Sequence, residues 1–285
     1  MTTQLRLVLP KGHLQAATFD LMNNVGWAVN DTGGYRPRCA DEHITIKMIR
    51  AANIPELIEL GAHDVGFTGQ DWVFETNADV VELLNTGLGR VNMVAAAPAG
   101  VDLFAQVRDR PLIIASEYPR MVDKFMEGRN VPYRCLRTFG ATEVFPPEDA
   151  DMIVDNTETG STLRANGLAI IGKIYESSMC AYANRAAYND PARRVMIDEM
   201  CLLLRGVLEA RKRVLLDLNV PADKLEQVVA LLPAMKAPTI QPLYGNQGYA
   251  VRAAVPIKQV KDIILKVVAA GATDILQTKV DKVIA

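Results

Sequence analysis

The sequence predicts an α/β protein, with a two-lobed body of parallel-type sheets followed by a smaller C-terminal domain of order βαββαβ. Three observations support this fold class. Short apolar strands alternate with helical stretches over the first 210 residues, and six shorter elements fill the remainder. The charge balance also changes, because residues 211–285 carry 11 basic and 6 acidic side chains whereas residues 1–210 carry 20 and 27. We therefore expect a domain boundary near Arg211.

In the body, strands are expected where short apolar runs are bounded by polar or turn-forming residues, at 5–9, 44–49, 64–67, 92–96, 112–115, 134–137 and 152–154. Helices are expected at 14–24, 54–60, 118–126 and 161–166, where apolar residues recur at helical spacing. This alternation is typical of parallel, doubly wound sheets. The Pro-Ala-Gly turn at 98–100 is expected to separate two lobes, each with its own sheet, so that a cleft lies between them.

A helix over 199–215 is expected to carry the chain into the C-terminal domain. That domain is expected to contain strands at 214–219, 239–243, 249–255 and 274–279, and helices at 221–232 and 256–270. This order is the ferredoxin-like, split βαβ arrangement. The order alone leaves a ligand-sensing role and a packing role equally open, because fold does not define function.

The composition excludes several classes of protein. At 285 residues, 49% apolar and 22% charged, the chain is globular in composition and suffices for about two domains. A net charge of −2 leaves no basic excess for nucleic acid or an anionic membrane, so any phosphate site must be local. The start lacks a secretory signal pattern and no apolar run approaches about 18 residues, which predicts a soluble cytoplasmic protein. Four cysteines without a Cys-x-x-Cys pair indicate neither a zinc site nor a disulfide framework.

The strongest local motif is the segment 151–163, in which a strand leads into a turn of hydroxyl residues around Gly160 and then into a helix. Backbone N–H groups at a helix N-terminus, with Thr and Ser hydroxyls beside them, form an anion site. The same residue types would occur if Thr159 or Ser161 only capped the helix, so both interpretations stay open. The segment is neither a Walker loop nor a dinucleotide-binding glycine motif.

Four further polar loops follow predicted strands, at the edge where open α/β sheets bind ligands. They are residues 10–13, 68–71, 116–119 and 138–143. Together with 151–163 they predict a site for a polyphosphorylated or sugar ligand. His13 is expected to face solvent at the start of a helix, and His43 and His63 lack the spacing of a metal pair. Trp27 and Trp72 are expected to fill cores, and no catalytic triad is recognisable.

Five segments, in order along the chain, give the sequence a resemblance to a known family. They are Leu-Pro-Lys-Gly at 9–12, Asp-Val-Gly-Phe-Thr-Gly-Gln-Asp at 64–71, Ala-Ser-Glu-Tyr-Pro at 115–119, ADMIVDNTETGSTLRANGL at 150–168 and Ala-Pro-Thr-Ile-Gln-Pro at 237–242. The longest segment resembles the phosphoribosyl pyrophosphate (PRPP) loop of the ATP phosphoribosyltransferases, the first enzymes of histidine biosynthesis. The length and the βαββαβ tail resemble the long form of the family, which carries its own regulatory domain and needs no separate partner subunit.

The resemblance implies a bilobal, periplasmic-binding-protein-like catalytic body and a ferredoxin-like regulatory domain. Lobe I would comprise residues 1–97 and 184–210, lobe II residues 98–183, and the histidine-binding regulatory domain residues 211–285. In the implied reaction, N1 of ATP attacks C1 of the phosphoribosyl group with inversion and displaces pyrophosphate. Mg²⁺ would be held mainly by the pyrophosphate, with no protein ligand assigned. Histidine would be a feedback inhibitor, and the chain would form a homo-oligomer, a hexamer with dimers as its active form.

The resemblance also assigns site residues by position. The 5-phosphate and ribose of PRPP would be held by Asp155, Thr159, Gly160, Ser161 and Thr162, with Thr157 and Glu158 as neighbours. The side facing ATP and pyrophosphate would comprise Lys11, Gly12, Gly69, Asp71 and Tyr118, together with Glu143 near a ribose hydroxyl. Asp217 and Thr239 match positions where histidine binds, and the Asp217 carboxylate suits an amino group. Departure of pyrophosphate leaves a cationic sugar that needs charge stabilisation more than a protein nucleophile, which agrees with the lack of a triad.

The sequence departs from the family pattern in two places. His13 stands where members often carry Arg, which removes a permanent, fork-shaped cation. The segment 144–150, with Pro146 and Pro147, stands where a glycine-containing segment is expected, and two prolines make it stiffer. Two other functions stay open: a two-lobed solute-binding or effector-sensing protein, and phosphoribosyl transfer to a different acceptor base.

Overall fold

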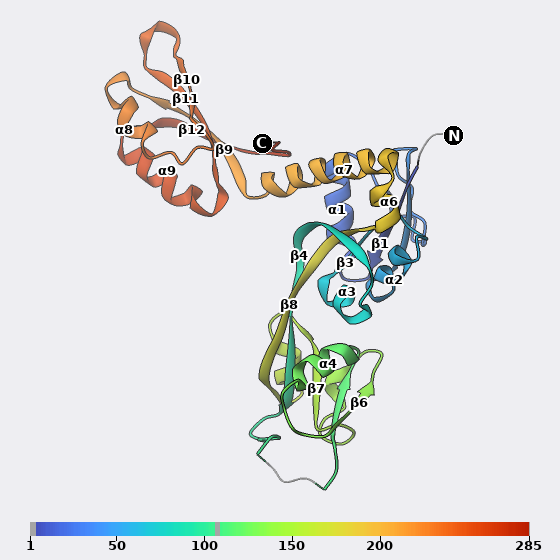
Figure 1. Ribbon diagram of the computed structural model, residues 1–285. Coiled ribbons are helices and arrows are strands. Elements are labelled where there is room, and N and C mark those ends of the chain that lie inside the picture. The colour runs from blue at the N-terminus through green and yellow to red at the C-terminus, as the bar shows by residue number, and fades with distance from the viewer. Residues whose placement is uncertain (1–3, 106–108, 285) are drawn as a thin grey trace. The chain divides into compact units, whose positions relative to one another are not determined.

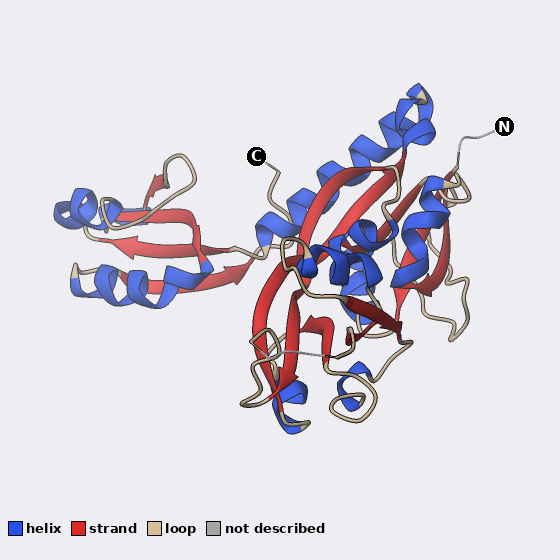
Figure 2. Cartoon of the chain, turned by 60° about the horizontal axis from the view of Figure 1, so that its bottom comes forward, coloured by secondary structure: helices blue, strands red, loops and turns tan. Residues whose placement is uncertain are grey.

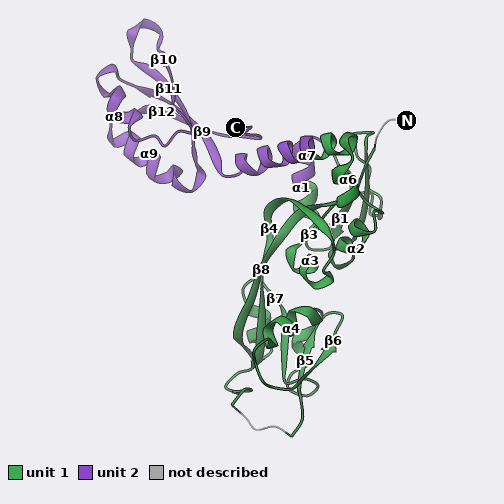
Figure 3. Ribbon diagram, in the orientation of Figure 1, with its two compact units in different colours: residues 1–20, 28–197 green, residues 21–27, 198–285 purple. Residues whose placement is uncertain are grey.

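The computed structural model describes residues 4–105 and 109–284, which form two compact units. The body unit comprises Met1–Asp20 and Ala28–Ile197, and the tail unit comprises Leu21–Trp27 and Asp198–Ala285 (Figure 3). The division falls inside helix α7 (Pro191–Ala210). The helix expected at 199–215 corresponds to α7, which begins and ends earlier than expected. It ends before Val214 and Leu215 because these residues belong to a strand in which buried and half-buried side chains alternate.

The body unit is built on one mixed sheet of eight strands in the order β2-β1-β3-β8-β4-β7-β5-β6. The strands are β1 (Leu5–Lys11), β2 (Ile44–Arg50), β3 (Val65–Gly69), β4 (Val80–Pro98), β5 (Leu112–Ser116), β6 (Tyr133–Arg137), β7 (Met152–Thr157) and β8 (Leu168–Asn184). β1, β2 and β3 pair in parallel at one end, which we call the first lobe, and β5, β6 and β7 pair in parallel at the other, the second lobe. The α/β class is confirmed, although the two expected sheets are joined into one.

β4 and β8 join the lobes. They run side by side as strands of 19 and 17 residues (Figures 1 and 2). Residues 179–183 of β8 pair with β3, whereas residues 92–96 of β4 pair with β7. The turn at 98–100 is thus the end of β4 and not the crossing between lobes, because residues 93–97 already lie in the cores of the second lobe. β8 escaped prediction because its burial does not alternate along its length.

Short helices flank this sheet (Figure 2). They are α1 (Gln15–Val25), α2 (Ile54–Glu59), α3 (Gln70–Thr76), α4 (Pro119–Met126), α5 (Ser161–Ala165) and α6 (Arg185–Asn189). α4 has Pro119 at its first turn, where a missing N–H costs nothing, and it buries Met121, Val122, Phe125 and Met126 on one face. The four helices expected in the body are present as α1, α2, α4 and α5, whereas α3 and α6 were not expected. In the parts of the chain that are described, the helices are all too short or too polar to cross a bilayer.

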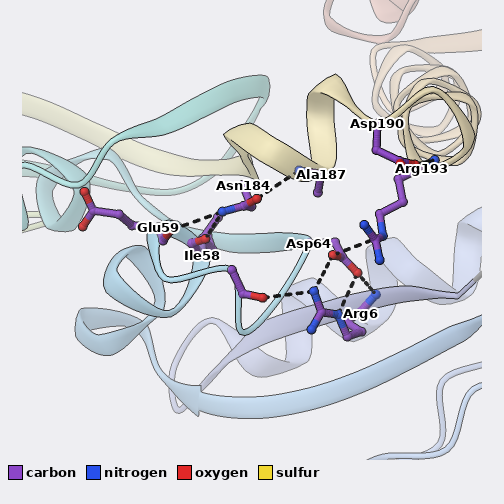
Figure 4. Close-up of polar contacts among 9 residues, drawn as sticks. Arg6, Ile58, Glu59, Asp64, Asn184, Ala187, Asp190 and Arg193 are labelled. Carbon is purple, nitrogen blue, oxygen red and sulfur yellow. Dashed lines mark hydrogen bonds and ion pairs between the residues drawn. The ribbon is translucent and has the colours of Figure 1, made fainter.

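A partly buried ion pair fixes the amino-terminal edge of the first lobe (Figure 4). Asp64 is 1% exposed and accepts from Arg6 Nε at 3.0 Å and Nη2 at 2.7 Å, while Arg193 Nε of α7 lies 3.6 Å away. Burial raises the pKa of Asp64, but the hydrogen bonds and charge of Arg6 outweigh it and hold the pKa below its usual value. Asn184, at the end of β8, donates to two carbonyls of α2 and accepts from the first turn of α6. These contacts hold β1, β8 and the start of α7 together.

The tail unit contains a four-stranded antiparallel sheet in the order β10-β11-β9-β12. Its elements are β9 (Arg213–Val220), α8 (Leu225–Val229), β10 (Thr239–Pro242), β11 (Tyr249–Pro256), α9 (Val260–Ala269) and β12 (Thr273–Lys279). Val228 of α8 and Val267 of α9 pack on the sheet beside Leu216 and Val251. The predicted βαββαβ domain is confirmed, with a shorter first helix than expected.

Candidate active site

A cavity of about 560 Å³ lies between the two lobes of the body unit, surrounded by loops from the carboxyl ends of β1, β3, β5, β6 and β7. These are the five loops that the sequence indicates. The predicted residues that line the cavity are Gly69, Asp71, Tyr118, Glu143, Asp155, Thr157, Glu158, Thr159, Ser161 and Thr162. Lys11, Gly12 and Gly160 lie beside lining residues but do not line it themselves. Through β8 and β4, the first-lobe strands run antiparallel to the second-lobe strands, so the carboxyl ends of both sets face the cavity from opposite sides.

Asp71 and Tyr118 form a buried pair between α3 of the first lobe and the start of α4 of the second. The Tyr118 hydroxyl donates to Asp71 Oδ2 at 3.1 Å, and Asn156 Nδ2 donates to the same hydroxyl at 3.0 Å. Ser177 of β8 donates to Asp71 Oδ1 at 2.5 Å. Burial raises the pKa of Asp71 despite these donors, and burial together with the Asp71 charge raises the pKa of Tyr118. Tyr118 therefore stays protonated and acts as a hydrogen-bond donor.

Acidic side chains form part of the second-lobe wall. Asp155, Glu117 and Glu143 all line the cavity. Burial raises the pKa of Asp155 to about 6, with a further rise from Glu117 and Glu143, while hydrogen bonds from the Asn156 N–H and from Thr142 lower it. A wall of this kind suits sugar hydroxyls, which donate to carboxylates, and it stabilises positive charge that develops next to it.

The loop before α5 has the features of an anion site. Gly160 has φ +71°, and its N–H donates to Thr157 Oγ1 at 2.9 Å. α5 begins after this glycine with no side-chain cap, and the Ser161 N–H reaches Thr159 Oγ1 only at 3.4 Å. The first N–H groups of a helix have no partner within it, so they are available to a ligand. Arg164 lies close by, since a Cβ at Gly160 would meet its Nη1 at 3.1 Å. The geometry thus favours anion binding over simple capping.

Close packing explains why a glycine stands at position 69 in the first-lobe wall of the cavity. A Cβ at Gly69 would lie 2.1 Å from Asp71 Oδ1, so any side chain there would displace the carboxylate. Lys11 lies with its Nζ 4.0 Å from the ring centre of Tyr35, and Gly12 has φ +102° in open space. His13, the departure from the family pattern, is exposed as expected and lines the cavity rim.

Sequence reasoning missed several residues of the site. Asn156 and Ser177 hold the Asp71–Tyr118 pair through hydrogen bonds. Asn156 lies inside the 151–163 motif and could have been found there, whereas Ser177 lies 106 residues from Asp71 and carries no signal in the sequence. Trp72 packs partly against the second-lobe core, as expected, but it also lines the cavity and stacks on Tyr118 with ring centres 4.4 Å apart. The proline segment follows Glu143, and its Phe145 packs against the second-lobe core.

In the tail unit, the two predicted residues lie in one row across the sheet. Arg252 of β11 is paired with Asp217 of β9 on one side and with Thr239 of β10 on the other. The Arg252 Nε donates to Asp217 Oδ1 at 2.5 Å. Sequence reasoning missed Arg252, because strand pairing brings it to Asp217 from 35 residues away. A carboxylate beside a guanidinium complements the ammonium and carboxylate groups of an amino acid.

Residues 4–105 and 109–284 contain no group of three or more His, Cys, Asp or Glu side chains placed to hold a metal ion. The cavity wall nevertheless fits a cation brought by a substrate. Mg²⁺ is commonly bound by one or two carboxylates together with substrate phosphates, and Asp155 and Glu117 supply such carboxylates.

The fold and the cavity define a two-lobed α/β protein with a polar, loop-lined cavity between its lobes. Comparison with known proteins gives the family. The family model described as ATP phosphoribosyltransferase matches residues 50–206, and the model described as HisG, C-terminal domain, matches residues 210–282. The ATP phosphoribosyltransferases of Pelotomaculum thermopropionicum and Desulforudis audaxviator are each 38% identical to the chain, over 99% of both sequences. The chain belongs to the ATP phosphoribosyltransferase family, a family of pentosyltransferases.

A solved structure shares the body fold. It is a chain of the ATP phosphoribosyl transferase (HisG:HisZ) complex from Thermotoga maritima, with a TM-score of 0.62 and 23% identity. The match covers 99% of that chain but 71% of this one. The similarity supports the mixed α/β fold of the body.

Proposed function

We propose that this chain transfers the 5-phosphoribosyl group of PRPP to N1 of ATP with inversion, releasing pyrophosphate, as the first step of histidine biosynthesis. One observation carries the proposal: the uncapped loop at 157–162 and the buried Asp71–Tyr118 pair line the same cavity. The loop supplies N–H groups and hydroxyls for a 5-phosphate, while Tyr118, whose hydroxyl proton is donated to Asp71, fixes the wall where the two lobes meet. Family membership identifies the donor and the acceptor.

The charges of the cavity suit the bond changes of this reaction. The N1 lone pair of adenine forms the new bond to C1 while the bond from C1 to the pyrophosphate oxygen breaks, and pyrophosphate leaves with that electron pair. C1 becomes cationic during the exchange, and Asp155 and Glu143 place carboxylates along the wall where we put the ribose. The remaining task is to hold two substrates in line, which can supply a large part of the rate acceleration.

The acidic wall also explains a need for a divalent cation. PRPP and ATP are polyanions, and the carboxylates of Asp155, Glu117 and Glu143 would repel them. Mg²⁺ neutralises phosphate charge and stabilises the leaving pyrophosphate when it is bound. The protein then contributes the loop that binds the 5-phosphate and the donors that orient the ribose.

Pyrophosphate release tests the proposal. The protein is mixed with PRPP, Mg²⁺ and ATP, and in parallel with GTP or free adenine in place of ATP. We expect release with ATP alone. Release with another base to the same extent would assign a different acceptor, and no release with any acceptor would overturn the enzymatic proposal, leaving a ligand-binding role.

We further propose that histidine inhibits the enzyme by binding in the tail unit, with its ammonium group on Asp217 and its carboxylate on Arg252 beside Thr239. The chain would act as a homo-oligomer, a hexamer with active dimers. In Asp217→Ala we expect the initial rate without histidine to stay within about twofold of wild type, because Asp217 lies outside the cavity. We expect histidine to inhibit this variant no longer, a loss that is measurable because coupling between an effector site and a ligand site typically amounts to about 5- to 150-fold. Unchanged inhibition in this variant would place the effector site elsewhere, and sedimentation with and without histidine tests the assembly.

A further inference from the structure

The carboxylate of Glu75 joins the two lobes outside the cavity. Glu75 lies in the last turn of α3, which follows a first-lobe strand. Its Oε1 accepts the backbone N–H of Arg120 at 2.9 Å, and its Oε2 accepts that of Met121 at 3.1 Å. Both N–H groups belong to the first turn of α4 in the second lobe, where a helix has no internal acceptors. One side chain of the first lobe thus caps a helix of the second.

The sequence of α4 leaves this cap to be supplied from elsewhere. The residue at its N-cap position is Tyr118, which makes no side-chain cap hydrogen bond. Its hydroxyl reaches instead to Asp71, one turn before Glu75 on the same helix α3. The start of α4 is therefore held to α3 at two levels, by the phenol of Tyr118 inside the cavity and by Glu75 outside it.

Neighbouring contacts reinforce this junction. Lys124 Nζ of α4 lies 4.7 Å from the ring centre of Phe74, next to Glu75. The positive charges of Arg120 and Arg137 and the two backbone N–H groups favour the Glu75 carboxylate, but burial outweighs them and raises its pKa. An apolar side chain at this position would leave both N–H groups without this acceptor, so the contact depends on the carboxylate. Glu75 is not among the residues that line the cavity.

We propose that Glu75 is a positioning residue, which holds the N-terminus of α4 against α3 so that Tyr118 meets Asp71 and Asn156 within the site. This proposal rests on the proposed function, because Tyr118 belongs to the ATP and pyrophosphate side. The two hydrogen bonds act on the backbone directly beside Tyr118, and they are made only when the lobes are in this arrangement. Losing them leaves the PRPP loop at 157–162 unchanged and loosens the part of the cavity wall that Tyr118 forms.

The experiment compares Glu75→Ala, Glu75→Gln and Glu127→Ala. Glu127 is exposed at the other end of α4, so its replacement removes the same charge without touching the junction. Hydrogen exchange followed by mass spectrometry measures the Arg120 and Met121 amides, and initial rates give kcat and KM. Rates are measured below the melting temperature of each variant, so that loss of folding does not enter.

In Glu75→Ala we expect about tenfold faster exchange at the two amides. We also expect about a tenfold lower kcat, with KM for PRPP within about twofold of wild type. Glu75→Gln, whose amide oxygen can still accept, should recover kcat to within about threefold, and Glu127→Ala should match wild type. Unchanged exchange at the two amides in Glu75→Ala would show that Glu75 does not hold them. Faster exchange together with a wild-type kcat would overturn the positioning role. If wild type itself releases no pyrophosphate, the proposed function fails, and the exchange measurement still decides the contact.

Discussion

Lowering the pH should switch off PRPP binding through one carboxyl group, Asp155. Its pKa is raised to about 6, chiefly by burial and then by the neighbouring charges of Glu117 and Glu143. With this pKa, about nine-tenths of the molecules carry an ionised Asp155 at pH 7 and about one-tenth at pH 5. If the carboxylate must accept from a ribose hydroxyl, kcat/KM for PRPP falls roughly tenfold between these pH values.

Unfolding would not account for this loss. The folded-state pKa of Asp155 lies above its ordinary value of 3.8, so the folded chain binds this proton more tightly than the unfolded chain does. Protonation of this group therefore adds to the free energy of unfolding as the pH falls from about 6 towards 4. Activity and stability should move in opposite directions over this range, as far as Asp155 determines them.

The assay is pyrophosphate release at low PRPP concentration from pH 5 to pH 8, with thermal melts at the same pH values. Asp155→Asn should be weakly active and should lack the step. Glu117→Gln removes a negative neighbour, so its midpoint should move to lower pH. A flat wild-type profile would refute the reasoning, and so would a step that persists unchanged in Asp155→Asn.

Three further predictions concern the loop at 157–162, the Asp71–Tyr118 pair and the ion pair between Arg6 and Asp64. Gly160→Val places a β-branched side chain at φ +71° beside Arg164 and should abolish turnover, whereas Gly128→Val, at φ +75° in an open turn, should cost similar stability and keep activity. Tyr118→Phe removes a donor from the buried Asp71 carboxylate, so chemical denaturation should show a loss of about 1–3 kcal/mol, with a lower kcat; an unchanged kcat would exclude Tyr118 from the site. Asp64→Asn should cost about 1–3 kcal/mol at pH 7, and the difference from wild type should shrink as the pH falls through the depressed pKa of Asp64; a pH-independent difference would contradict the ion pair.

Local patterns predicted most of the elements. α4 combines a proline at its first turn with apolar residues on one face, and β9 alternates in burial, so each carries its own signal. β8 does not, because it begins in one lobe and ends in the other: residues 169–176 are exposed or half-buried, whereas residues 177–184 are all buried. The lobe crossing was misplaced because the 19-residue β4 continues through Gly87 and Gly89, both at positive φ, and reaches the second lobe before the turn at 98–100.

The candidate site was predictable where it follows the ends of strands. The loops at 68–71, 116–119 and 151–163 carry polar and glycine residues directly after apolar runs, and the strand order brings them together. Ser177 and Glu75 have no such signal, because a serine within a strand and a glutamate within a helix are ordinary residues there. Their roles arise from partners 106 and 45 residues away, which only the folded chain reveals.

A crystal structure of the protein with PRPP and Mg²⁺ tests the central claim most directly. The account predicts the 5-phosphate on the backbone N–H groups and hydroxyls of residues 159–162, and the ribose hydroxyls beside Asp155 and Glu143. It also predicts the pyrophosphate towards the side of Asp71 and Tyr118, near His13 at the rim. PRPP bound at another surface, with the 157–162 loop free of phosphate, would contradict it.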